Sequence, residues 1–106
     1  MGHCYRLHGS DRMGLPQMRD ALSASLGIRF DTRESGFKGG EYYLARVGGS
    51  GKVTIEANWV DDEGYLAEPD FPNHSTLVYA TDLDARMLSA LENAAGLPCL
   101  RVEHVD

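Results

Sequence analysis

The chain has 106 residues, of which 42% are apolar and 25% are charged, and this composition predicts one soluble domain with a single core. A domain of this size can fold without metal or disulfide bonds, so its two cysteines do not indicate a disulfide framework. The sequence has no apolar run long enough to span a membrane and no secretory signal, so we expect a cytoplasmic protein that binds no membrane.

The N-terminal half predicts a strand, a helix and then further strands joined by turns. Residues 3–9 form a possible strand. Pro16 suits the first turn of a helix over residues 16–26, and Gly27 suits its left-handed end. Alternating apolar and polar side chains then predict three strands, which cover residues 28–33, 41–47 and 53–59. The glycine-rich residues 48–51 predict a hairpin turn between the last two.

The C-terminal half begins with an acidic loop over residues 61–73, followed by an apolar segment, 77–80, that is typical of a central strand. Thr81 or Asp82 would cap a second helix. Its apolar stripe consists of Leu83, Met87, Leu88, Leu91, Ala94 and Ala95, its end is at Gly96 and Pro98, and a last strand covers residues 99–105. The order (β)αββββαβ predicts an α+β two-layer sandwich, with two helices on one face of a mostly antiparallel sheet of five or six strands.

The two halves of the chain carry opposite net charge. Residues 1–53 hold eight Lys and Arg side chains against five acids, a net charge of +3, whereas residues 54–106 hold two against eleven, a net charge of −9. Binding of nucleic acid requires a basic surface, so the acidic half argues against such a ligand. It favours a basic protein as the partner.

Two motifs that often indicate chemistry are incomplete. Residues 48–52, with the Gly-Lys pair at 51 and 52, lack the flanking residues of a phosphate-binding loop, because Arg46 replaces its first glycine and Val53 its hydroxyl. Cys4, His8 and Cys99 would form a zinc site only if the terminal strands were neighbours, and their spacing is not that of a metal motif. We therefore predict no catalytic residues, no metal site and no cofactor.

The acidic loop is the first candidate for binding. It is either a solvated loop or a recognition surface for a basic partner, with five carboxylates supplied by Asp61, Asp62, Glu63, Glu68 and Asp70. Aromatic residues among charges are typical of interface anchors, and the candidates here are Trp59, Tyr65 and Phe71. Trp59 also continues the inward alternation of its strand, which is equally consistent with a place in the core.

A second dense patch is an alternative ligand loop. It combines cations, a hydroxyl group, aromatic rings and two glycines (Gly39 and Gly40), and its side chains are Arg33, Ser35, Lys38, Tyr42 and Tyr43. Backbone N–H groups and cations in such a loop can hold an anion. The same residues also fit a turn followed by a strand whose tyrosines point to opposite faces, and we favour that structural interpretation.

Three segments together resemble a known group of proteins. Residues 33–43 (RESGFKGGEYY), 55–58 (IEAN) and 67–72 (AEPDFP), followed by an apolar strand and a helix, resemble small bacterial immunity proteins of polymorphic and contact-dependent toxin systems. The resemblance spans roughly residues 15–103 and rests on shape-giving motifs. It implies a non-enzymatic α+β protein that binds and inhibits a cognate toxin domain.

Two other classes of function remain open from the sequence. One is a small ligand-binding or enzymatic domain that uses the loop from Arg33 to Tyr43, which a deep pocket with convergent polar groups would favour. The other is a structural or regulatory subunit that dimerises through a sheet edge, which a long and apolar edge strand would favour.

Overall fold

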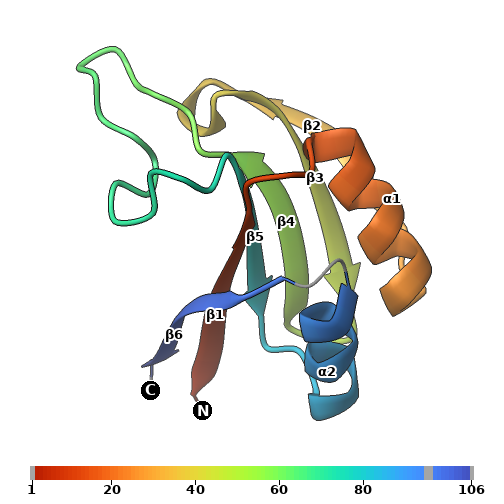
Figure 1. Cartoon of the computed structure of the whole chain (residues 1–106). Coiled ribbons are helices and arrows are strands. Elements are labelled where there is room, and N and C mark those ends of the chain that lie inside the picture. The colour runs from red at the N-terminus through yellow and green to blue at the C-terminus, as the bar shows by residue number, and fades with distance from the viewer. Residues whose placement is uncertain (1, 95–96, 106) are drawn as a thin grey trace.

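The structure is a computed structural model that describes residues 2–94 and 97–105. Two helices lie on one face of a six-stranded sheet (Figure 1). In chain order the elements are β1 (His3–Ser10), α1 (Leu15–Leu26), β2 (Asp31–Ser35), the 3₁₀ helix η1 (Gly36–Lys38), β3 (Gly40–Val47), β4 (Gly51–Ala57), β5 (Thr76–Thr81), α2 (Ala85–Asn93) and β6 (Cys99–Val105).

The sheet has the strand order β2-β3-β4-β5-β1-β6, and every neighbouring pair is antiparallel. The predicted α+β fold and the predicted order of elements are confirmed. β5 lies between β4 and β1, as expected for a strand that is apolar on both faces. The first and last strands are neighbours, so the two ends of the chain lie at the same side of the sheet (Figure 1).

The core lies between the sheet and the two helices. Met18 and Leu22 of α1 and Leu91 of α2 pack against Ile55 and Val78, and all five side chains are fully buried. These residues recur at helical spacing in α1 and at alternate positions in the strands, which is the pattern that buries one face of each element. The hydrophobic effect of this packing holds the helices on the sheet.

The first helix begins and ends as its sequence indicates. Pro16 lies in its first turn, where the missing N–H group costs no hydrogen bond. Gly27 ends the helix with φ +66°, a left-handed conformation that glycine adopts without strain.

The second helix begins later than expected. Its N-cap is Asp84, whose side chain accepts a hydrogen bond from the Met87 N–H at 2.8 Å. Asp82 has φ +50° and binds the start of β1 instead, accepting from the Cys4 N–H at 2.7 Å. The predicted cap at Thr81 or Asp82 is therefore wrong, because the Asp82 carboxylate binds the start of β1. Leu83, predicted in the apolar stripe of the helix, precedes the helix. The predicted stripe residue Ala95 and the predicted end at Gly96 lie outside the described residues.

Two strand boundaries also differ from the prediction. β2 begins at Asp31, and the preceding Ile28 and Phe30 pack against the core from the connection to α1. β4 ends at Ala57, so Trp59 belongs to the loop after it. Within residues 2–94 and 97–105, every helix is too short or too polar to cross a membrane.

Candidate functional site

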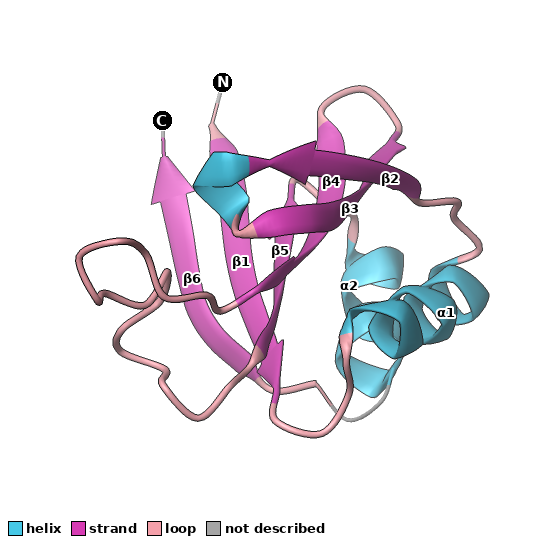
Figure 2. Ribbon diagram, turned by 90° about the horizontal axis from the view of Figure 1, so that it is seen from above, coloured by secondary structure: helices cyan, strands magenta, loops and turns pink. Residues whose placement is uncertain are grey.

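The face of the sheet turned away from the helices carries the polar side chains of the central strands. We call it the open face. The register places Thr54 of β4 opposite Tyr79 of β5, Tyr79 opposite Leu7 of β1, and Leu7 opposite Arg101 of β6. Residues 58–75 form a long loop on this side of the sheet, opposite the helices, as the view from above also shows (Figure 2).

Glu68 of this loop lies on the open face and forms an ion pair with Arg101 through two N···O contacts. Its carboxylate lies 2.9 Å from Nη1 of Arg101 and accepts a hydrogen bond from Nη2 of Arg101 at 3.1 Å, and one of its oxygens also accepts from the Tyr79 hydroxyl at 3.1 Å. Glu68 is only 8% exposed. The expectation that it is one of the solvated loop carboxylates is therefore corrected, because a buried carboxylate needs such partners.

A second ion pair lies beside the first. Glu56 of β4 accepts hydrogen bonds from the Lys38 ammonium group at 3.1 Å and from the Thr54 hydroxyl at 2.8 Å. The same ammonium group lies 5.2 Å from the centre of the Tyr42 ring, a cation–π contact. Lys38, which η1 contributes to the open face, is thus held by the Glu56 carboxylate and by the Tyr42 ring.

The environment of Tyr79 changes its acidity. Burial raises the pKa of the Tyr79 hydroxyl most, and the nearby Glu68 carboxylate raises it further. The hydrogen bond that the Arg101 guanidinium donates to Glu68 raises the pKa of Arg101. Tyr79 therefore stays a neutral hydrogen-bond donor and Arg101 stays a cation at physiological pH.

Two shallow cavities adjoin along the open face and share Lys38, Glu56 and Tyr79 in their walls. One, of about 310 Å³, extends toward Lys52 and Tyr5. The other, of about 350 Å³, lies beneath the loop and is also lined by Phe37, Trp59, Asp61, Tyr65, Leu66 and Ala67. The structure thus places Lys38 of the second sequence patch beneath the acidic loop.

Large apolar side chains are exposed at the mouth of the second cavity. Phe37 of η1 is 95% exposed and Tyr65 of the loop is 64% exposed. Both line the cavity together with Asp61, and the neighbouring Asp62 and Glu63 are exposed as well. We call Phe37 and Tyr65 the aromatic pair and Asp61, Asp62 and Glu63 the acidic rim.

The acidic rim has a defined backbone. One carboxylate oxygen of Asp61 accepts hydrogen bonds from the N–H groups of Glu63 and Tyr65, both at 2.9 Å. Gly64 has φ +88°, which a turn of this kind requires. The tip of the loop is thus shaped by its own residues, with Asp62 and Glu63 pointing their charge at solvent. Asp70 is also exposed, but it lines neither cavity of the open face.

The other two predicted anchors have structural contacts. Trp59 packs so closely on Gly39 that a side chain there would lie 2.5 Å from the Trp59 Cγ atom. Phe71 is half-buried in an edge contact with His74, and its carbonyl oxygen accepts from the Asn58 amide at 3.0 Å. Trp59 lies outside the core cluster, so the alternative that places it in the core is wrong. It lines the cavity beneath the loop and connects the loop to η1 through Gly39, and its role as an interface anchor stays a prediction.

The alternative ligand loop does not gather its residues into one site. Tyr43 points to the helices and is buried, whereas Tyr42 lies on the other face, as expected for successive strand residues. Ser35 caps η1 by accepting from the Phe37 N–H, and Arg33 is an exposed residue near Asp31. Only Lys38 of the five predicted residues lines a cavity of the open face.

The terminal strands are neighbours, but they do not gather the two cysteines and His8, because Cys4 pairs with His104 at the other end of β1. His8 pairs with Cys99 in the register, but His8 is fully buried and Cys99 is exposed. In the part of the chain that the structure describes, no three His, Cys, Asp or Glu side chains form a group that could hold a metal ion.

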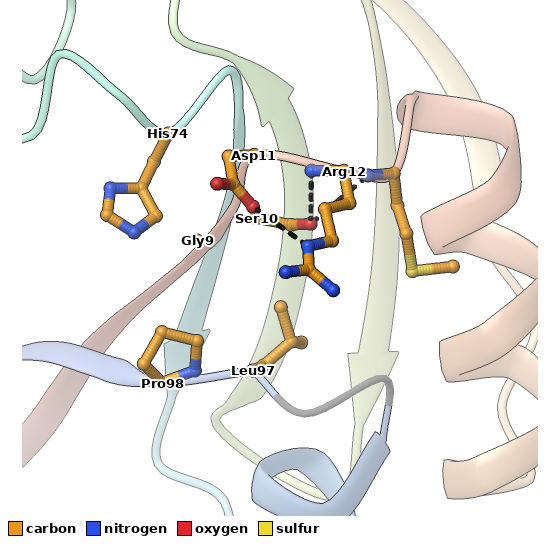
Figure 3. Close-up of a pocket in the computed structure, with 8 residues that line it drawn as sticks. Gly9, Ser10, Asp11, Arg12, His74, Leu97 and Pro98 are labelled. Carbon is orange, nitrogen blue, oxygen red and sulfur yellow. Dashed lines mark hydrogen bonds and ion pairs between the residues drawn. The ribbon is translucent and has the colours of Figure 1, made fainter.

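The largest cavity, of about 640 Å³, lies apart from the open face, where β1 ends ahead of α1 (Figure 3). His74 and Pro98 line it on one side, and Ser10 and Arg12 lie across from them. The Ser10 hydroxyl already accepts from the N–H groups of Arg12 and Met13, at 3.1 Å each. These polar groups shape the chain's entry into the helix and do not converge on the cavity.

Sequence reasoning missed Phe37 and the partners of Glu68. A large apolar residue between turn-forming glycines has no sheet face to enter, and this signal could have identified Phe37. Arg101 and Tyr79 lie far from Glu68 along the chain, and no local pattern predicts such a contact.

No protein-family model, no curated protein and no solved structure matches this chain. The open face, the aromatic pair and the acidic rim are therefore the basis for inferring function, together with the resemblance stated from the sequence.

Proposed function

We propose that this chain is an immunity protein that binds a basic toxin domain and inhibits it in the cytoplasm of the producing bacterium. The observation that carries the proposal is the aromatic pair beside the acidic rim. Phe37 and Tyr65 expose large apolar surface at one spot, and three carboxylates lie next to them. Exposed aromatic rings bordered by charge are typical of protein interfaces.

Charge supports a basic partner. Residues 54–106 carry a net charge of −9, and the acidic rim presents part of it at the tip of a loop that projects from the sheet (Figure 1). Opposite fields accelerate the encounter of two proteins over about a Debye length, some 8 Å at physiological salt. An inhibitor that must capture a toxin quickly gains most from such steering.

The two carboxylates buried on the open face are both paired, which favours binding over catalytic turnover. Glu56 is held by Lys38 and Thr54, and Glu68 by Arg101 and Tyr79. General acid–base catalysis requires carboxylates whose pKa values are pushed apart and that reach a substrate. Carboxylates committed to ion pairs instead give a rigid platform beneath the loop, which suits a binding protein.

The binding test uses a candidate toxin domain from the protein encoded immediately upstream of this chain's gene, and it measures association and dissociation rates at several salt concentrations. Replacing the acidic rim (Asp61→Asn, Asp62→Asn, Glu63→Gln) should lower the association rate by about tenfold at low salt and flatten its salt dependence. The matched control neutralises three exposed acids elsewhere, Asp11, Asp20 and Glu34, and should change the rate much less.

The aromatic pair should act on dissociation. Phe37→Ala or Tyr65→Ala should each weaken binding by about 2 kcal/mol or more, mostly through faster dissociation. In cells, the wild-type chain should restore growth to bacteria that express the toxin domain, and the combined variant should not. An unchanged association rate for the rim variant together with unchanged affinity for the aromatic variants would contradict this surface.

A second candidate function is binding of a small polar ligand in the 310 Å³ cavity. Lys38, Lys52, Thr54, Glu56 and Tyr79 line it, which gives it donors and acceptors on one floor. A screen of small charged metabolites by thermal shift, with Lys52→Met as the comparison, distinguishes it from protein binding.

A further inference from the structure

The two edges of the sheet differ in how well they are protected. The outer strand β2 has five residues, and its side chains from Asp31 to Glu34 are exposed and mostly charged. Short, charged edge strands resist pairing with another chain. This edge is therefore closed to strand addition.

The opposite edge is formed by β6, which is longer and has a smaller share of charged side chains. β6 has seven residues, and within the described chain it pairs with β1 alone. Its exposed side chains include Val102, 42% exposed, and Val105, 49% exposed. A strand of this length with exposed valines presents a row of backbone N–H and C=O groups that another strand can satisfy.

The sequence of β6 is complementary to itself. If two copies of the strand run antiparallel about a twofold axis at Val102, then Arg101 of each copy lies opposite Glu103 of the other. Opposite charges in directly facing positions stabilise an antiparallel pair, whereas like charges would destabilise it. A register centred on Glu103 would instead place two carboxylates face to face.

Arg101 is already held in position for this contact. Its guanidinium binds Glu68 through one hydrogen bond and a second ion-pair contact, and it reaches Glu103 of its own strand at 3.3 Å. Its side chain remains 38% exposed, and that of Glu103 is 58% exposed. A cation fixed by one carboxylate loses little side-chain entropy when it meets another.

We propose that β6 is the dimer interface of this protein, where it pairs antiparallel with β6 of a second copy about an axis at Val102. The pairing joins two six-stranded sheets into one continuous sheet and gives a closed, isologous dimer. Because residues that face each other in this register lie on the same side, the open faces of both copies share one side of the joined sheet. The acidic rim is not part of the interface.

Light scattering coupled to size exclusion tests the oligomeric state. We expect the wild-type protein to have twice the 11.6 kDa chain mass at a concentration of about 100 μM. Val102→Lys places two like charges at the axis and should raise the dimer dissociation constant by about tenfold or more. The matched control is Val105→Lys, which adds the same charge on the same strand away from the axis and should keep the dimer. Circular dichroism melts verify that both variants fold.

Cysteine crosslinking tests the register. In a background with Cys4→Ser and Cys99→Ser, Val102→Cys should form a disulfide-linked dimer under mild oxidation, because directly opposite residues have Cα atoms about 4.5–5.5 Å apart. Val105→Cys should not crosslink, since the two copies of that residue lie at opposite ends of the paired strands.

Three results would overturn the proposal. The first is a monomeric wild-type protein up to several hundred micromolar. The second is a dimer that Val102→Lys leaves intact. The third is crosslinking of Val105→Cys in place of Val102→Cys. None of these results depends on a toxin, so the test separates dimerisation from the proposed inhibitory function.

Discussion

Glu68 carries a buried charge that its neighbours compensate. Removing a carboxylate from water costs free energy, and the ion pair with Arg101 and the hydrogen bond from Tyr79 offset that cost. The pair also ties the loop to β6, since Glu68 and Arg101 come from these two segments. The residue thus stabilises the platform beneath the proposed interface.

Glu68→Gln should therefore destabilise the protein. We expect a loss of about 1–2 kcal/mol in the free energy of unfolding, less than for a fully buried pair because the Arg101 side chain is 38% exposed. Urea denaturation of Glu68→Gln, Arg101→Met and the double variant measures the coupling. Glu63→Gln, at an exposed position of the same loop, should change stability by less than about 0.5 kcal/mol. Additive effects of the two single changes would contradict the coupling.

His8 is buried in its neutral form. Its side chain is fully buried on the helix-facing side of β1, and burial lowers its pKa below the ordinary value of 6.5. The attraction of Glu92 opposes this shift, but desolvation is the larger cause. The unfolded chain therefore binds a proton at a pH where the folded chain does not.

The free energy of unfolding should consequently decrease as the pH is lowered below about 6.5. The contribution of His8 is fully present above the pKa of the unfolded chain and is lost as the pH drops toward the lower folded pKa, with a slope of at most about 1.4 kcal/mol per pH unit. Urea denaturation between pH 7.5 and 5.0 should show a shallower dependence for His8→Leu than for wild type. His104→Gln, at an exposed position, should keep the wild-type slope. Equal slopes for wild type and His8→Leu would contradict a buried neutral imidazole.

The 58–75 loop and η1 form one unit although they are separate in sequence. Asn58 holds the loop closed by accepting from the Glu68 N–H at 2.9 Å and donating to the Phe71 carbonyl at 3.0 Å. Trp59 then packs on Gly39, directly after η1. The aromatic pair depends on this contact, because Phe37 belongs to η1 and Tyr65 to the loop.

Gly39→Ala should break this unit. The residue has φ +78°, and an added Cβ would lie 2.5 Å from Trp59 Cγ. Left-handed strain and the clash together should cost about 1–3 kcal/mol, measured by thermal or urea unfolding. Gly36→Ala is the matched control, since a Cβ there meets nothing within 4 Å and φ is not positive. It should be neutral or slightly stabilising. Equal effects of the two changes would contradict both the left-handed conformation of Gly39 and its contact with Trp59.

The molecule as a whole gains its stability from the apolar layer between sheet and helices. Leu22, Leu91, Ile55 and Val78 are fully buried there. The acidic rim and the ion pairs of Glu56 and Glu68 lie elsewhere, on the loop and the open face. The helices cover one face of the sheet, and the 58–75 loop lies on the other (Figure 2).

A strong chelator should leave the unfolding temperature unchanged. The apolar core suffices for a domain of this length, and the described residues show no group of three side chains that could hold a metal ion. Thermal unfolding with and without about 5 mM chelator checks the prediction, because a concentration of this order removes a structural metal ion. A drop of about 5 °C or more would reveal a metal that contributes to stability.

The sequence by itself determined the elements and the layer they form. Apolar side chains at helical spacing in α1 and at alternate positions in β4 identify the face that each element buries, and glycines mark the turns. These signals are local, so they also placed Tyr42 and Tyr43 on opposite faces of β3. The acidic character of the loop was visible from composition alone.

Only the tertiary structure decided which charges remain free for a partner. Glu68 is not part of the exposed acidic surface, because Arg101, 33 positions away in the sequence, binds it on the open face. Asp82 does not cap α2, because its carboxylate accepts a hydrogen bond from a backbone N–H group of β1. Both choices depend on strand order and register, which bring distant residues within hydrogen-bond reach. Local propensity carries no information about such distances, because it acts over a few residues of chain.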